Sequence, residues 1–201
     1  NTSNAAGDIS FSVDPVNKVQ FTDNFANGVT YTTSSGLTGL TGDAGDPGSF
    51  YYRAGDTITL TIGDVKIAEF SATAINGSYL FLQDVAGTSL SDVNLNYVEN
   101  MAIFLQALDS DHIDSTPGDG VLQTNDLQNT VTSYNNNIVI TQAIRDAFTG
   151  YIDPTTGAAL DISVAGKQQI SNALASVNIE FTRDTERDAS GNNVFETIAI
   201  D

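Results

Sequence analysis

Short alternations of apolar and polar residues mark the first part of the chain and predict β-strands. They cover residues 9–13, 18–21 and 29–33, and turn-forming residues separate them. Such alternation places every second side chain on one face of a strand, which is typical of a half-buried sheet. Residues 34–49 hold five glycines and a proline and are predicted to form a loop.

The clearest strand pattern lies over residues 49–70. Isoleucine or leucine alternates with threonine over 57–62, and Gly63-Asp64 separates this run from a second apolar run over 65–70. Two residues of this type are typical of the tight turn in an antiparallel hairpin. A short strand over 49–52 and a turn over 53–56 precede the hairpin. The stretch therefore predicts an antiparallel sheet with one apolar and one polar face.

Helical spacing of apolar residues predicts three helices in the second half of the chain. The first covers 98–108, and its apolar face holds Val98, Met101, Ala102, Leu105 and Leu108. The second is capped by Thr141 and ends at Gly150, with an apolar face of Ala143, Ile144, Ala147 and Phe148. The third covers 165–176 and is expected to bury Ile170, Ala173 and Leu174. Residues 125–134 can form a further short helix.

Residues 177–183 and 194–200 are predicted to form a closing antiparallel pair. Strands at both ends of the chain with helices between them are typical of the α+β class. We expect a single domain over residues 1–201, with an antiparallel β sandwich-like scaffold and a few short helices. The two groups of strands can share one sheet.

Oxygen-rich segments flank the predicted helix at both ends. The upstream segment offers Asp92, Asn94, Asn96 and Glu99, and the downstream segment offers Asp109, Asp111, Asp114, Asp119 and Asp126. Calcium requires about six to eight oxygens, and short oxygen side chains at every second position supply several of them from one loop. Both clusters are therefore predicted to bind calcium. Tyr97 and Ile103 stand where an EF-hand has glycine and glutamate, so the site is not an EF-hand.

Simpler interpretations exist for some of these acids. Asn96 can cap the helix while Glu99 reaches back to the cap, an arrangement that needs no metal. Asp43 and Asp46 in the glycine-rich loop are a further candidate calcium pair, but acidic residues are also common turn formers. Asp153 begins a turn over 153–157 and is expected to face water.

Charge narrows the possible partners. Seven Lys and Arg residues against 25 Asp and Glu residues give a net charge of −18, which repels nucleic acid and anionic membranes. The chain has no cysteine and one histidine, so sulfur-bound zinc and imidazole-rich metal sites are excluded. Because dense carboxylates repel one another in a compact state, we expect calcium to stabilise the fold.

Several function classes do not fit the sequence. No apolar run is long enough to span a membrane, and no signal segment is visible. An enzyme is not expected, because His112 is the single imidazole available to a catalytic triad. A sugar-cleaving site is disfavoured because the chain has no tryptophan. Since calcium is abundant outside cells, we expect an extracellular module of a longer, secreted cell-surface protein, monomeric and not inserted in a membrane.

Two segments carry a resemblance to a known family. Residues 48–63 match the pattern G-x-F-x-Y-x-x-G-D-x-I-x-L-x-I-G, and residues 100–111 contain Leu105-Gln106-Ala107-Leu108-Asp109-Ser110-Asp111. Over residues 28–145 the chain resembles the peptide-binding domain of giant calcium-dependent RTX adhesins of bacteria. The hairpin part of the pattern also occurs in lipoproteins of unknown role.

The resemblance implies a module for cell adhesion and biofilm formation. Such a module holds the free C-terminal residues of surface proteins on host or neighbouring cells, and a bound calcium ligates the terminal carboxylate. We place this open calcium site at Asp109, Asp111 and Asp114. Two alternatives remain: a calcium-dependent carbohydrate-binding module, and a spacer domain that calcium stiffens and that binds no ligand.

Overall fold

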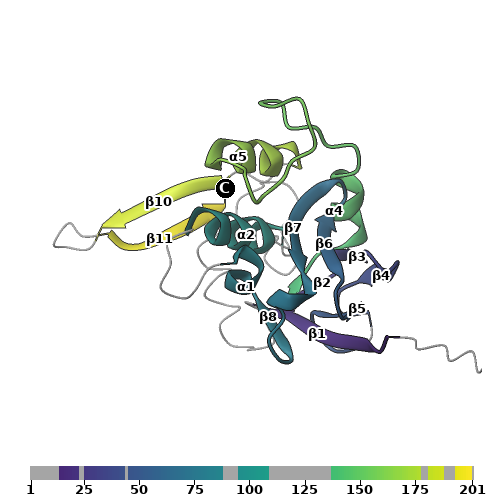
Figure 1. The fold of residues 1–201 in the computed structure, drawn as a ribbon. Coiled ribbons are helices and arrows are strands. Elements are labelled where there is room, and N and C mark those ends of the chain that lie inside the picture. The colour runs from purple at the N-terminus through teal and green to yellow at the C-terminus, as the bar shows by residue number, and fades with distance from the viewer. Residues whose placement is uncertain are drawn as a thin grey trace, which may run out of the picture.

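A computed structural model describes residues 14–22, 25–43, 45–87, 95–108, 137–177, 181–187 and 193–200, the last two ranges as backbone strands. The described residues form an α+β arrangement of several small sheets and a few short helices (Figure 1). In chain order the elements are β1 (Val16–Thr22), β2 (Ala26–Asn27), β3 (Thr30–Thr33), β4 (Thr38–Leu40), β5 (Ser49–Arg53), β6 (Thr57–Ile62), β7 (Val65–Ser71), a 3₁₀ turn (Ala72–Ala74), β8 (Tyr79–Phe81), α1 (Leu82–Ala86), α2 (Leu95–Ala107), β9 (Ile138–Val139), α4 (Gln142–Ala147), α5 (Lys167–Ser176), β10 (Phe181–Arg187) and β11 (Asn193–Ile200).

The largest sheet is antiparallel, with strand order β4-β3-β6-β7. Its β6–β7 hairpin confirms the turn predicted at Gly63-Asp64, and the apolar residues of β6 are fully buried while its threonines are exposed or half-exposed. Gly63 has φ +56, and a Cβ atom there would lie 2.5 Å from the carbonyl oxygen of Arg145. The turn therefore requires glycine both for its left-handed backbone and for its close contact with α4.

A second sheet has the order β5-β1-β8 and contains pairings that the sequence did not predict. Strand β5 pairs with β1, where Val19 lies opposite Phe50, and does not pair with β6. Strand β8 joins β1 in parallel, with Phe21 beside Leu80. Strands β2 and β9 also pair in parallel. The expected antiparallel scaffold thus describes part of the strand pairing, and parallel contacts connect segments that are distant in sequence.

Two further expectations about strands need correction. Strand β4 lies within residues 34–49, which were predicted to be a loop, because Thr30 and Tyr31 of β3 pair with Leu40 and Gly39. Strands β10 and β11 form the predicted closing pair, but they make a sheet of their own and do not extend the N-terminal sheets. In Figure 1 this hairpin projects beside α2 and α5. The predicted strand at 9–13 and helix at 125–134 lie outside the described residues.

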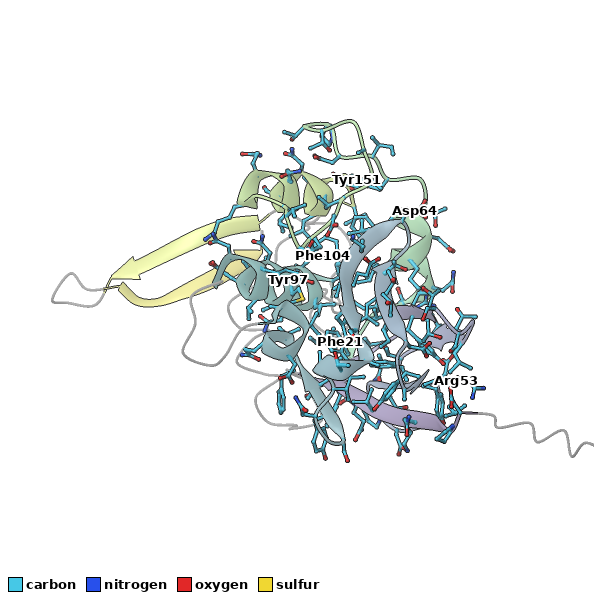
Figure 2. All side chains as sticks on the ribbon, viewed as in Figure 1. Phe21, Arg53, Asp64, Tyr97, Phe104 and Tyr151 are labelled. Carbon is cyan, nitrogen blue, oxygen red and sulfur yellow. The ribbon has the colours of Figure 1, made fainter. Side chains whose placement is uncertain are left out.

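Helix α2 is the centre of the apolar packing. The helix predicted over 98–108 is confirmed and begins three residues earlier, and Met101, Phe104 and Leu108 are fully buried. Phe104 packs on Phe148 with ring centroids 5.4 Å apart. Side chains of both larger sheets and of α1, α2 and α5 join one apolar cluster (Figure 2). The middle and the C-terminal end of α2 are therefore anchored in the core.

Helix α4 docks on the hairpin turn of the main sheet. Its cap is the predicted Thr141, whose Oγ1 accepts a hydrogen bond of 3.3 Å from the Ile144 amide. Phe148 is buried as expected, but Ala143 and Ala147 are exposed. The helix is six residues long and packs mainly through its C-terminal end, where Asp64 accepts a 2.6 Å hydrogen bond from the Gly150 amide. The predicted apolar face is therefore wrong in part.

Arg145 ties α4 to the parallel β2–β9 pair. Its Nη1 donates to the carbonyl oxygens of Gly28 and Ile140, each at 2.7 Å, and its Nη2 donates to Gln142 at 2.7 Å.

Helix α5 follows the sequence prediction closely and buries Ile170, Ala173 and Leu174. None of the described helices is long and apolar enough to cross a membrane.

Candidate functional site

The N-terminal part of α2 holds the two predicted calcium ligands, Asn96 and Glu99, whose positions the structure describes. Asn96 is exposed. Glu99 accepts a hydrogen bond of 2.9 Å from Lys167 Nζ at the start of α5, and the two side chains are 30% and 47% exposed. Because α2 begins at Leu95 and Glu99 contacts Lys167, the capping arrangement considered for Asn96 and Glu99 differs from the contacts observed.

The other predicted ligands lie outside the described residues. These are Asp92, Asn94, Asp109, Asp111, Asp114, Asp119 and Asp126. His112 lies outside them as well. Among the side chains that the structure does describe, no three of His, Cys, Asp or Glu gather closely enough to hold a metal ion. Calcium binding at the two ends of α2 therefore stays a prediction.

The inward polar residues of α2 fasten the helix to its neighbours. Tyr97 is buried and its hydroxyl donates to the Ile67 carbonyl of β7 at 3.1 Å. Burial, with a smaller effect of the Asp161 charge, raises the pKa of Tyr97, so the phenol keeps its proton at neutral pH. Asn100 is 2% exposed and its Nδ2 donates to the Ala165 carbonyl at 2.8 Å. These contacts fix the rotation of α2 about its axis.

An ion pair secures the free edge of β7. Lys66 Nζ lies 2.6 Å from Asp161 Oδ2, and their side chains are 33% and 26% exposed. Burial alone would raise the pKa of Asp161, but hydrogen bonds from Lys66 and Ser163 outweigh it and lower the pKa. The Lys66 backbone also donates to Leu160 and accepts from Ile162, each at 2.9 Å. The ion pair and these backbone hydrogen bonds therefore hold residues 160–162 along the edge of the sheet.

Asp153 overturns one expectation from the sequence. It was predicted to face water, yet it is 0% exposed. Its carboxylate accepts hydrogen bonds from the amides of Thr155 and Thr156, each at 3.1 Å, from Thr156 Oγ1 at 2.8 Å, and from Gln169 Nε2 at 2.7 Å. Burial raises the pKa of such a group, but these hydrogen bonds outweigh burial and lower it to about 2. Asp153 thus joins the 153–157 turn to α5.

Asp56 has a similar enclosed position at the end of the β5–β6 turn. It is 3% exposed and accepts from the Arg53 amide at 2.7 Å and from Ser35 through its amide and hydroxyl, each at 2.9 Å. The hydroxyl of Ser34 donates to it at 3.1 Å. These hydrogen bonds outweigh the effect of burial and lower the pKa of Asp56. Asp56 therefore connects the turn over residues 53–56 to the turn at Ser34 and Ser35.

The glycine-rich loop carries the other candidate calcium pair. Asp46 forms an ion pair with Lys18 of β1, and both side chains are about half exposed, at 52% and 45%. Asp43 is exposed. Lysine already provides a cation for Asp46, which supports its interpretation as a turn residue over its interpretation as a calcium ligand.

Local sequence signals could have predicted part of the hydrogen-bond network around Asp153. An aspartate followed two and three residues later by Thr155 and Thr156 is typical of a side chain that accepts from the next backbone amides. The partner Gln169 comes from helix α5 and has no such signal.

No protein-family model matches the chain, and no curated protein or solved structure matches it.

Proposed function

We propose that the chain is a calcium-dependent adhesion module that binds the free C-terminal residues of partner proteins through a bound calcium. The observation that carries the proposal is the position of α2. Its last residue, Ala107, is buried and Leu108 just after it is fully enclosed, and the acidic segment that begins at Asp109 follows directly. A cluster of ligands that starts from a rigid element can hold an ion more precisely than one on a free loop.

Charge supports calcium as the link to the partner. A peptide carboxylate that approaches a chain of net charge −18 meets repulsion, unless a cation with a vacant coordination position receives it. The lysines at positions 18, 66 and 167 are already paired with acids. In this proposal calcium also stabilises a sandwich-like packing of the sheets, and the module belongs to a secreted, extracellular protein of a bacterial cell surface.

Calorimetry with one peptide as the free acid and as the C-terminal amide tests the mechanism. We expect the acid to bind in calcium and to lose its binding in chelator, and we expect the amide not to bind, because amidation removes the charge that calcium ligates. Equal affinities of acid and amide would refute the terminal-carboxylate mechanism. If acid-terminated peptides fail to bind while sugars bind in calcium, the calcium-dependent carbohydrate module is favoured.

Melting curves test the calcium sites separately from the ligand. Each site that binds the native state alone contributes RT ln(1 + [L]/Kd), about 2.7 kcal/mol when calcium exceeds Kd a hundredfold. Asp109→Ala and Asp111→Ala should lower the melting temperature in calcium and reduce the effect of chelator. Asp14→Ala, at an exposed position outside all the candidate calcium clusters, is the matched control. A curve that exhaustive chelation leaves unchanged would contradict the calcium sites, whereas calcium stabilisation without any ligand would favour the spacer.

A further inference from the structure

Strand β8 exposes two large aromatic side chains at the edge of a sheet. Tyr79 and Phe81 are each 47% exposed, while Leu80 between them is fully buried. The ring of Phe25 lies 6.1 Å from the ring of Tyr79, at a tilt of 38°. Edge strands that carry exposed aromatic groups favour unwanted association. Two exposed rings on one edge strand, with the partly buried ring of Phe25 beside them, therefore indicate a surface with a ligand.

The groups beside these rings are neutral hydrogen-bonding side chains. In the parallel β1–β8 pairing, Gln20 lies beside Tyr79 and Thr22 lies beside Phe81. The intervening residues Phe21 and Leu80 are buried, so the flanking pairs share the outer face of the sheet. Figure 1 shows β8 next to β1 at one end of the molecule.

Among the described residues, two charged side chains near this face in sequence, Asp84 and Lys18, already have partners. The Asp84 carboxylate accepts a hydrogen bond of 2.9 Å from the Phe81 amide at the start of α1. Lys18, two residues before Gln20, is paired with Asp46. A charged ligand would therefore find no available counter-charge in these two side chains, and an acidic one would also meet the net charge of −18.

We propose that Tyr79, Phe81 and Phe25 form an aromatic platform that binds a neutral saccharide. One face of a pyranose ring is rich in C–H groups and packs on the face of an aromatic ring. Its hydroxyls can donate to Gln20 Oε1, since Gln20 Nε2 already donates to the Pro47 carbonyl at 2.8 Å, and can bond to Thr22. Tyr79 and Phe81 stand two residues apart on a strand, which separates their Cα atoms by about 6.6–6.8 Å, so each ring can face its own sugar unit. The platform requires no metal and is distinct from the calcium sites.

The test uses an array of neutral oligosaccharides, read in calcium and again in chelator at a temperature below both melting transitions. We expect binding of at least one neutral oligosaccharide in both conditions. The double substitution Tyr79→Ala/Phe81→Ala should weaken that binding at least about tenfold. As a matched control, Ile152→Ala/Val164→Ala removes side chains that are 53% and 80% exposed elsewhere on the surface, and it should leave the affinity unchanged.

A fluorescent variant keeps the proposal testable if the double variant folds poorly. The chain has no tryptophan, so Tyr79→Trp places a single indole in the platform. We expect this variant to retain binding and to change its emission when the oligosaccharide is added. The Tyr79→Ala/Phe81→Ala variant should keep calcium-dependent peptide binding, so failure of one proposal is distinguishable from failure of the other.

Three outcomes would overturn the platform. They are the absence of binding to every neutral oligosaccharide, binding that Tyr79→Ala/Phe81→Ala leaves intact, and a concentration-dependent dimer of the unmodified chain that this double substitution abolishes. The last result would make the β8 edge an interface between two copies of the chain.

Discussion

Asp153 and Glu99 show two different ways in which this chain accommodates a carboxylate. Asp153 is completely buried, and its four hydrogen bonds come from amides, a hydroxyl and a side-chain amide, all of them neutral. Glu99 is 30% exposed and is paired with Lys167. One carboxylate depends on fixed dipoles in the interior, and the other depends on a partly exposed lysine at the surface.

The difference follows from the scarcity of positive charge. With 25 acids and 7 lysines and arginines, most carboxylates must be satisfied without a lysine or arginine. Backbone amides and hydroxyls in tight turns stabilise the ionised form well, because their dipoles are held in place before the charge arrives. Surface pairs contribute less, since water and salt screen them. The two environments should therefore respond very differently to substitution.

The largest effect is expected for Asp153→Ala. This change leaves the donors of Thr155, Thr156 and Gln169 without their acceptor in a position closed to water, and it opens a cavity. We expect the melting temperature to fall by on the order of 10 °C. Asp43→Ala, at an exposed turn position, is the matched control and should stay within about 2 °C of the unmodified protein. Equal melting temperatures for the two variants would contradict the role of Asp153 as the connection to α5.

An intermediate effect is expected for Asp161→Asn. The substitution keeps the shape of the side chain but removes the charge that Lys66 contacts at 2.6 Å. Because both groups are partly exposed, we expect a loss of about 1–2 kcal/mol in the free energy of unfolding. A double-mutant cycle with Lys66→Met separates the pair from each side chain alone. A coupling energy of zero would show that the contact contributes nothing to stability.

Acid should act through the same enclosed groups. The pKa of Asp153 is about 2 in the folded chain against an ordinary value of 3.8, so between these values the unfolded chain binds more protons. Stability is therefore fully present above about pH 4 and falls as the pH is lowered toward 2. The lowered pKa values of Asp56 and Asp161 act in the same direction.

Chemical unfolding at a series of pH values checks this acid dependence. In Asp153→Asn, the free energy of unfolding should depend less steeply on pH between pH 4 and pH 2. The difference in slope should correspond to the uptake of about one proton on unfolding. An unchanged slope in this variant would assign the acid sensitivity to other carboxylates.

The smallest effect is expected for Glu99→Gln. The exposed pair with Lys167 should contribute about 0.2–1 kcal/mol, and less at high salt. Melting at low and high ionic strength measures both values. If the loss is larger and depends on calcium instead of salt, Glu99 is a metal ligand as the sequence predicted, and Lys167 occupies the position of the cation when calcium is absent.

Local patterns predicted the elements better than their partners. The alternation over β6 and β7, the Gly63-Asp64 turn and the apolar face of α5 were all visible in the sequence, because neighbouring residues determine them. The pairing of β5 with β1 and the parallel contact of Ala26 with Ile138 were not. Such pairings depend on contacts between segments that are far apart in the chain, for which no local spacing gives a register.

The same limit applies to the candidate site. The acid-rich ends of α2 stand out by composition, yet composition does not show which acids are already satisfied. Asp153 and Asp56 look like ordinary turn residues in the sequence, and their burial depends on partners at Gln169, Ser34 and Ser35. Counting acids therefore overestimates the number available for calcium. Hydrogen-bond donors that come close only in the fold decide which ones remain.

The hydrogen bonds that join Arg145 to the β2–β9 pair have a consequence for how this protein can change over evolution. Residues 109–136 begin after the buried Leu108 and end before β9, and the guanidinium of Arg145 holds β9 next to β2 through Ile140 and Gly28. Both attachment points are thus fixed by contacts outside the segment. Sequence changes between these two points leave those contacts in place, so residues can be gained, lost or exchanged there while the described scaffold persists. New binding preferences can arise there without a new fold, and laboratory grafting can use the same two points.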